Sequence, residues 1–407
     1  MACSKAKNFK ALKSGNCIYS HRPTSRQMTF GFVINSGSIY DGEKRGLHHL
    51  TEHITASAVN DPERSTILEN LEMHGGSFNA ETSPYQTMYF CTVPADFAKL
   101  AIDTIKALIN NFSAGLKDLS KHKKVTIREY ELHQQDYAIR FDDEFMSYTF
   151  GADHPYGAAI GGTPKSIEAI QIEDIEALWK TKYAPDNLLF IATGNFKLEE
   201  ITKNLIEVST PATPPATKII LPTPQIKTQF IKEDDFWQEA NISIASLPTP
   251  YKNIKELCLA EILCSMLSDG FSSPLLIWRE NSGLFYECSF AYQIYPDFMQ
   301  LLFQSHTDPS NKDRLIEGFW RIYNATITNE QRFKFAVNRC INESYFYNED
   351  PEDLWDDAAE ELGCLNRVIP LSEKVNLMHR IKLEEVQKLA NDRFSQNNTY
   401  TFICKPR

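Results

Sequence analysis

Two histidines and a glutamate stand together in His49-x-x-Glu52-His53, and their types and spacing could hold and use a metal ion. On a helix, residues four apart lie on one face, so His49 and His53 can direct both imidazoles at one ion. Two imidazoles and a carboxylate suit Zn²⁺, which in catalytic sites keeps one position for water. Glu52 lies beside the two histidines and can accept the proton of that water as a general base. The alternative is a solvated helix that carries two histidines by accident.

Composition limits the classes of protein that need to be considered. The chain has 407 residues, 42% of them hydrophobic, which is enough for a substantial core and predicts two or more domains. Its formal net charge is −11, and we find no basic cluster in the sequence, which argues against nucleic acid or an anionic membrane surface as the main partner. No window approaches about 18 apolar residues, so we expect no membrane-spanning helix.

The cysteines and the first residues bear on location. There are nine cysteines, an odd number without any C-x-x-C pair, which is typical of reduced thiols and predicts a cytoplasmic protein. Residues 1–40 contain lysines and arginines but no acidic residue, which a transit peptide would also show. Strand-like runs at 9–19 and 28–34 favour folded structure there instead.

Periodicity and turn residues predict the order of the elements. A helix over 67–74 ends at Gly75-Gly76, a C-terminal glycine signal. The further elements that we expect are strands at 77–82 and 87–93, helices at 97–112, 119–137 and 172–182, and an apolar strand at 187–192 closed by Gly194.

The sequence repeats itself at an offset of 211 residues, since Tyr183 matches Phe394 and Asn187 matches Asn398. We therefore predict two homologous α+β domains, residues 1–210 and 226–407, joined by a proline-rich linker over 211–225. At the same offset His53 corresponds to Cys264, and the second half contains no His-x-x-Glu-His. Only the first half can therefore carry this metal site.

An ordered set of motifs extends over nearly the whole chain and carries a family resemblance. The motifs are Gly46-x-x-His49-x-x-Glu52-His53, Gly75-Gly76-x-x-Asn79-Ala80-x-Thr82, Glu129, His154-Pro155-Tyr156-Gly157, Gly162-Thr163 and Tyr183-x-Pro185-x-Asn187. The chain resembles the pitrilysin family of inverzincin zinc peptidases, with insulin-degrading enzyme and mitochondrial processing peptidase among its members, in the half-size form. The resemblance implies two domains, each a mainly antiparallel sheet packed with helices, that form half of a clamshell.

The resemblance also implies a third zinc ligand, a glutamate about 76 residues after the second histidine. Glu129 has this spacing from His53, and a third protein ligand must come from another element because one helix face cannot complete a tetrahedron. The alternatives are a solvated charge at Glu129, or Glu131 as the ligand. Two residues depart from the family pattern: His122 replaces a second glutamate, with Asp118 as the candidate to compensate for it, and His48 replaces a small residue.

Two further segments resemble substrate contacts of the family. Asn79 and Ala80 belong to an expected edge strand that could pair with an extended peptide through main-chain hydrogen bonds; an ordinary hairpin is the alternative. In the second half, Arg279 and Tyr286 resemble a pair that reaches the active site from a distant domain and could bind peptide carbonyls or the developing oxyanion. A surface arginine and a core tyrosine are the alternative here.

We therefore expect a zinc-dependent endopeptidase that acts on peptides held in an enclosed cavity, with one zinc per chain. The rival hypotheses are a non-catalytic subunit of a processing-peptidase-like complex and a half-enzyme that needs a different partner. By resemblance, Arg279 and Tyr286 should reach the zinc of another chain, which favours a homodimer over a heterodimer with a related chain.

Overall fold

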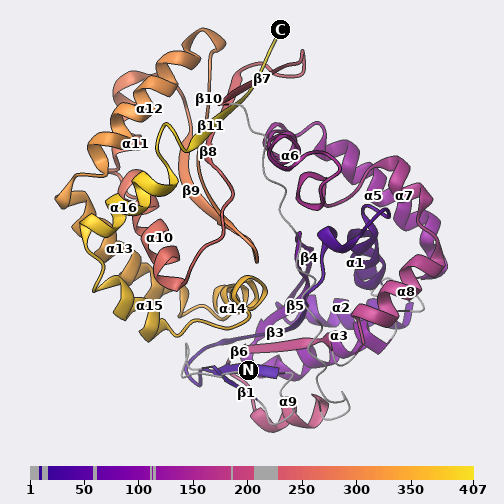
Figure 1. Ribbon diagram of the computed structural model, residues 1–407. Helices are drawn as coiled ribbons and strands as arrows, with labels where there is room; N and C mark the ends of the chain where they lie inside the picture. Colours follow the sequence, from indigo (N-terminus) through magenta and orange to yellow (C-terminus); the bar gives the residue numbers. More distant parts are fainter. Residues whose placement is uncertain are drawn as a thin grey trace. The chain divides into compact units, whose positions relative to one another are not determined.

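The computed structural model describes residues 9–11, 17–57, 62–110, 112, 116–184, 187–205 and 228–407. Two compact units are present, one of residues 1–217 with 347–370 and one of residues 218–346 with 371–407. The predicted linker over 211–225 lies outside the described residues. Figure 1 shows the elements of both units.

The sheet of the first unit has six strands in the order β1-β2-β6-β3-β5-β4. Only β2 and β6 pair in parallel, and the other four neighbours are antiparallel, which confirms the predicted mainly antiparallel sheet. β4 lies at one edge of the sheet. The strands are β1 (Lys10–Ala11), β2 (Cys17–His21), β3 (Gln27–Ile34), β4 (Ser77–Thr82), β5 (Thr87–Pro94) and β6 (Leu189–Gly194).

Both faces of this sheet are covered, which explains the almost uniformly buried β3. Successive side chains point to opposite faces, so Phe32 packs in the cluster with α3 (Ala98–Asn110) and Val33 in the cluster with α14 (Pro351–Leu365). Trp355 of α14 donates its indole N–H to Ile191 O at 3.1 Å. Residues 351–365 fall within the predicted second domain, 226–407, but α14 packs on the first sheet and groups with the first unit (Figure 1).

The remaining described helices of the first unit lie before residue 206. The predicted helix over 119–137 ends earlier, at His133, and a separate helix begins at Tyr137, because the Asp136 side chain accepts the N–H groups of Ala138 and Ile139. The α-helices are α1 (Leu47–Ser57), α2 (Pro62–Met73), α5 (Leu119–His133), α6 (Tyr137–Phe150), α7 (Pro164–Ala169), α8 (Ile172–Lys182) and α9 (Leu198–Leu205). The 3₁₀ turns are η1 (Ser38–Tyr40), η2 (Ala95–Phe97), η3 (Leu116–Asp118) and η4 (Pro155–Gly157).

The second unit repeats the strand pairing of the first. Its order is β7-β11-β8-β10-β9, with one parallel pair, β7 and β11, in the place of β2 and β6. Corresponding strands begin 210 to 213 residues apart, close to the predicted offset of 211. The strands are β7 (Gln229–Glu233), β8 (Ala240–Ser246), β9 (Cys288–Ile294), β10 (Met299–Thr307) and β11 (Thr399–Lys405).

Helices pack on this second sheet as well. They are α10 (Ile254–Ser268), α11 (Pro274–Ser282), α12 (Lys312–Thr326), α13 (Glu330–Tyr347), α15 (Leu371–Met378) and α16 (Leu383–Arg393), with the 3₁₀ turn η6 (Pro309–Asn311). Among the helices that the structure describes, none is both long and apolar enough to cross a bilayer.

Candidate metal centre and active site

The helix that carries the metal motif, α1, starts on a buried aspartate. Asp41 accepts the N–H of Gly46 at 2.7 Å and the N–H of His48 at 3.0 Å, so a carboxylate caps the first turn. The same carboxylate hydrogen-bonds Nδ1 of His48 at 2.6 Å, and Nε2 of His48 hydrogen-bonds Ser36 Oγ at 2.8 Å. All three side chains are buried, so this Ser-His-Asp arrangement anchors the helix and has no access to a substrate.

One face of α1 is apolar and the other carries the motif. Leu47, Leu50 and Ile54 pack into a buried cluster with α7 and α8. Residues of the opposite face contact α5 and β4: His53 hydrogen-bonds Glu129 of α5, and Glu52 hydrogen-bonds Thr82 of β4. The helix period therefore separates the residues that fix α1 from the residues that could do chemistry.

The structure brings His49, His53 and Glu129 together. Nε2 of His53 lies 3.2 Å from Nε2 of His49 and 2.9 Å from Oε2 of Glu129, and Nε2 of His49 lies 3.8 Å from the same Oε2. Four ligand atoms about 2.0–2.1 Å from Zn²⁺ in a tetrahedron are roughly 3.4 Å apart. The triangle of donor atoms therefore fits a zinc ion, and among the described residues no other group of three or more metal-binding side chains is brought this close.

The charges of the three residues suit ligands. Burial, together with the charge of His53, lowers the pKa of His49 to about 4, so its imidazole is neutral. The hydrogen bond from His53 lowers the pKa of Glu129, which keeps that carboxylate ionised. Burial lowers the pKa of His53, but its hydrogen bond to Glu129 and the charge of Glu52 outweigh burial and raise it. A metal ion therefore competes with a proton for His53.

Glu52 lies beside the triangle and is not part of it. Its side chain is 93% buried, and Oε2 accepts a hydrogen bond from Oγ1 of Thr82 at 3.0 Å. Burial raises the pKa of Glu52, as suits a group that must hold a proton during a reaction. A cavity of about 450 Å³ opens over these residues and is also lined by Ala80 of the edge strand β4.

The predicted peptide-binding residues of the first half lie on this edge. β4 pairs with β5 on one side, and in the described part of the sheet no strand lies on the other side. The N–H of Ala80 donates to Oδ1 of Asn79 at 3.0 Å, so the edge amide is satisfied by a side chain that can move away. Asn79 is exposed, and Ala80 is half-buried. The edge geometry needed for strand addition is therefore present.

Arg279 and Tyr286 lie in the second unit, at the end of α11 and in the segment after it. Nη1 of Arg279 donates to Tyr286 O at 3.4 Å, and its guanidinium also pairs with Glu280. The Tyr286 side chain is 81% exposed, so it is not a core tyrosine. Their part in binding substrate stays a prediction.

The two departures from the family pattern have structural roles. Nε2 of His122 hydrogen-bonds Ser57 Oγ at 3.0 Å and so ties α5 to the end of α1, while burial lowers the His122 pKa and keeps it neutral. Asp118 is exposed at the N-cap position of α5 and makes no side-chain cap bond. His48 belongs to the buried anchor of α1.

Sequence reasoning missed three residues of the site. Thr82 belongs to one of the family motifs, but the motif alone does not indicate that its hydroxyl orients Glu52. Nε2 of His133 lies 3.9 Å from Oε1 of Glu129, a neighbour that the four-residue spacing on one helix could have indicated. Gly161 lies against the His49 ring, where an added Cβ would be 3.2 Å from Nδ1.

Comparison with known families matches two consecutive descriptions. Insulinase (Peptidase family M16) matches residues 16–163, and Peptidase M16 inactive domain matches residues 169–339. The chain belongs to peptidase family M16, which confirms the resemblance drawn from its motifs. The second match agrees with the lack of His-x-x-Glu-His in the second half.

Individual relatives support the half-size form. The chain is 22% identical over 406 residues to an uncharacterized zinc protease of Rickettsia felis, with 97% of both chains covered. It is 25% identical over 243 residues to a probable mitochondrial-processing peptidase subunit beta of Schizosaccharomyces pombe, covering 58% of this chain and 53% of that one. Its fold matches a peptidase M16 inactive domain from Pseudomonas fluorescens with a TM-score of 0.80 and 17% identity, and 98% of each chain is covered.

Proposed function

We propose that this chain is a zinc metalloendopeptidase. The observation that carries the proposal is the triangle of His49, His53 and Glu129 donor atoms with the separate, buried carboxylate of Glu52 beside it. Zinc in this site would supply a Lewis acid that polarises a peptide carbonyl and makes water more acidic. The zinc-protease relatives favour this chemistry over other uses of a metal.

The chain's own residues divide the remaining work. Glu52 accepts the proton of the attacking water and returns it to the leaving amine, while Thr82 holds the carboxylate in place. The free edge of β4 binds the extended substrate at Asn79 and Ala80 through main-chain hydrogen bonds, which gives affinity without demanding one sequence.

The metal is tested by elemental analysis of protein purified without chelator. We expect about one zinc per chain, and alanine at His49 or His53 should abolish it. Glu129→Gln should weaken zinc binding, whereas Glu131→Gln, an exposed carboxylate of the same helix, is the matched control and should not. Native protein without metal would contradict the proposal.

The reaction is tested by Glu52→Gln, which keeps the shape of the side chain but removes its basicity. Zinc content should stay at the native level while hydrolysis of a peptide library falls by at least ~10²-fold, the low end for a lost general base. Cleavage at near the native rate would show that Glu52 is not the base.

The remaining proposals concern partners and location. We propose a homodimer in which Arg279 and Tyr286 complete the site of the other chain, supported by the exposure of Tyr286, Phe271 and Ile277 on the second unit. A cytoplasmic location is supported by free thiols at all described cysteines. Peptides are the expected partners, and we propose no role for nucleic acid or membrane, given the net charge of −11.

A non-catalytic or partner-dependent subunit is the second candidate, since the chain also resembles an inactive domain in fold. The retained metal triangle and Glu52 favour the enzyme. The zinc and Glu52→Gln measurements separate the two candidates, because a non-catalytic chain would show no cleavage for the substitution to remove.

A further inference from the structure

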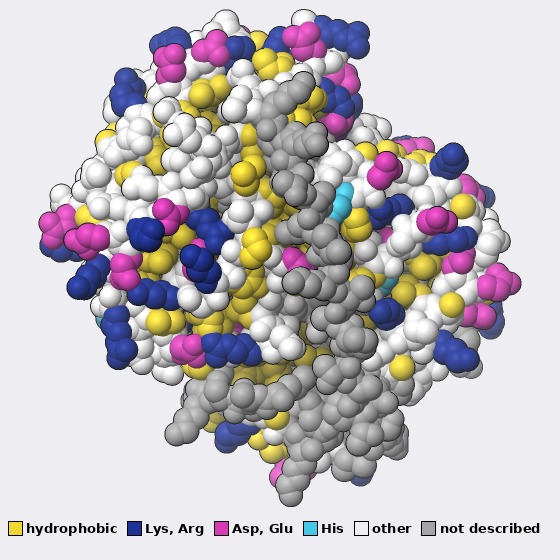
Figure 2. Space-filling view, viewed as in Figure 1, with side chains coloured by type: hydrophobic (Ala, Val, Ile, Leu, Met, Phe, Trp, Pro, Cys, Tyr) yellow, Lys and Arg dark blue, Asp and Glu magenta, His cyan; other side chains and the backbone are white. Residues whose placement is uncertain are grey.

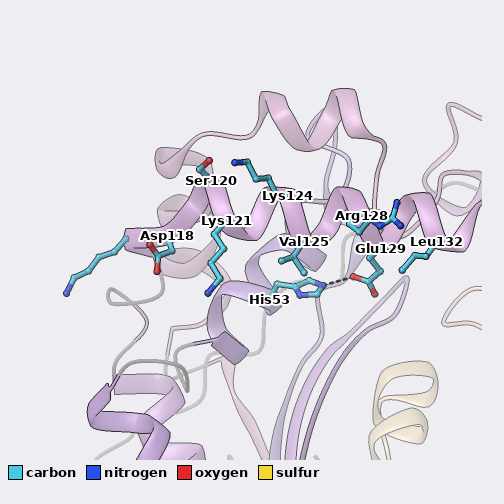
Figure 3. A pocket seen from close by; sticks show the side chains of 10 residues that line it. His53, Asp118, Ser120, Lys121, Lys124, Val125, Arg128, Glu129 and Leu132 are labelled. Carbon is cyan, nitrogen blue, oxygen red and sulfur yellow. Dashed lines mark hydrogen bonds and ion pairs between the residues drawn. The ribbon is translucent and has the colours of Figure 1, made fainter.

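A second cavity, of about 790 Å³, shares His53 and Glu129 with the metal centre and extends from there along α5 as far as Lys117. Figure 3 shows Lys121 and Val125 projecting from α5 on the side where His53 lies, with Asp118 and Glu129 near the two ends of the view. Both cavities reach His53 and Glu129; the first is lined by β4 as well as α5, and the second extends along α5.

Four cations line the α5 cavity: Lys117, Lys121, Lys124 and Arg128. At about 100° per residue, the three that belong to α5, Lys121, Lys124 and Arg128, lie within roughly 60° of one another around the helix axis. The three lysines are exposed, and no ion pair of theirs is found among the described residues. Arg128 pairs with Glu131 at 2.8 Å, and among the described residues Asp118 is the only carboxylate besides Glu129 that lines this cavity.

The cavity that β4 also lines carries a different charge. Its carboxylates besides Glu129 are Glu52, Glu81 and Asp143, and its described lining includes no lysine or arginine. A chain of net charge −11 thus places a run of cations along one of the two described cavities that border its metal centre. On the face seen in Figure 2, by contrast, acidic and basic side chains lie interspersed.

We propose, resting on the proposed peptidase function, that the α5 cavity binds acidic side chains of peptide substrates. Lys124 and Lys121 stand about 7.5 and 12 Å along the α5 axis from Glu129, at 1.5 Å per residue. An extended peptide spans about 3.4 Å per residue, so the acidic residues lie about two to four positions from the cleaved bond, on one side of it.

Binding to the zinc-loaded Glu52→Gln protein tests this inference without turnover. The probes are a labelled peptide with three glutamates near one end and the same peptide with glutamines. The glutamate peptide should bind about tenfold more tightly in 50 mM salt, and high salt should reduce the difference. Lys121→Gln/Lys124→Gln should remove most of it. Lys165→Gln/Lys180→Gln, the same change of charge on exposed residues of α7 and α8, should not.

Each outcome is decisive for one of the two proposals. Equal binding of the two peptides, or equal loss in both double variants, overturns the inference even if the native protein cleaves peptides. Charge-dependent binding without any cleavage by the native protein counts against the peptidase function and leaves the binding site standing. Where the native protein cleaves, mass spectrometry of the products should find acidic residues enriched on one side of the cut; enrichment on both sides or neither overturns the inference.

Discussion

At the scale of single residues, the hydroxyl of Thr82 decides how Glu52 is presented. Among the described residues, this hydroxyl is the one hydrogen-bond donor, at 3.0 Å, to a carboxylate that is almost fully buried. Thr82→Val keeps the shape and removes the donor, so kcat should fall about tenfold while zinc content and KM change little. Thr82→Ser should restore the rate. Thr92→Val, which removes a hydroxyl pair with Thr29 on the same sheet, is the control; equal losses in both variants would mean a general effect on the sheet.

Asp143, in the cavity over the metal centre, should make stability depend on pH. Burial raises its pKa to about 6 from 3.8, while the charge of His133 opposes the shift and those of Asp142 and Glu144 add to it. Because the folded pKa is the higher one, ionisation of this carboxylate opposes folding. The free energy of unfolding should fall as pH rises from about 4 to 6, by ~1–3 kcal/mol.

Asp143→Asn removes this loss. Thermal unfolding of metal-free protein should show the variant more stable than native at pH 7.5 and nearly equal to it at pH 4.5. Asp142→Asn, an exposed neighbour, is the control. A variant that is less stable than native at pH 7.5 would contradict the prediction.

The residues of the site differ in how far sequence alone could find them. His49, Glu52 and His53 share one helix, so spacing was enough to group them. Glu129 needed the family spacing, because it comes from another helix. The roles of Thr82 and His48 depend on contacts across 30 and 12 residues of chain, which no local pattern encodes.

At the scale of elements, three glycines fit the loop before α7 against the start of α1. Gly46 and Gly162 have positive φ, and a Cβ at Gly162 would lie 2.4 Å from the carbonyl oxygen of Arg45. Only glycine tolerates both the backbone conformation and this approach. Gly161, in the same loop, lies against the His49 ring, so the contact also holds a metal-binding residue.

Gly162→Ala should therefore lower the free energy of unfolding by ~2–4 kcal/mol and weaken zinc binding. Gly42→Ala is the matched control: its φ is +60, but nothing lies within 4 Å of an added Cβ, so only the conformational cost of about 1 kcal/mol should appear. Chemical unfolding of the two metal-free variants and zinc titration check this, and equal losses would contradict it.

Local sequence patterns predicted the order of the strands and helices well. They predicted less well to which of the two units each element belongs. Strands at 77–82 and 87–94 and the helix at 172–182 were predicted almost to the residue, since turns and periodicity mark them. The break before α6 depends on one capping aspartate, Asp136. The packing of α14 on the first sheet joins segments more than 150 residues apart, which propensity does not reveal. The run of lysines on α5 was also missed, because helix spacing and not sequence adjacency brings them together.

At the scale of the whole molecule, the two units share an architecture but differ in metal-binding residues. The five strands of the second sheet pair in the same order as β2, β6, β3, β5 and β4 of the first sheet, so the second unit keeps the architecture. Cys264 and Cys340 stand at the positions that correspond to His53 and Glu129, and burial raises the pKa of both thiols, which keeps them uncharged. The role proposed for the second unit is therefore a different one: Arg279 and Tyr286 complete the active site of another chain.

A mixing experiment tests whether Arg279 and Tyr286 of one chain act at the active site of the other chain. One chain carries Glu52→Gln and the other Arg279→Ala/Tyr286→Ala, so each alone should be nearly inactive. In a mixed two-fold dimer, one site combines the intact Glu52 with the intact pair, and the other site holds both defects. Random exchange makes about half of the dimers mixed, with one working site in two, so activity should return to about a quarter of native.

The control for the pair is Arg314→Ala/Tyr345→Ala, which removes an exposed arginine and an exposed tyrosine elsewhere on the second unit and should keep full activity. Exchange itself is measured with chains of different mass, so that a lack of rescue has one meaning. If subunits exchange and activity does not return, the pair does not act across the interface. If the double variant is fully active by itself, the pair does not serve the site at all. Activity at a quarter of the native level is expected only when each site is built from two chains. If each site were built from one chain, every chain would keep its own defect, and mixing would restore no activity.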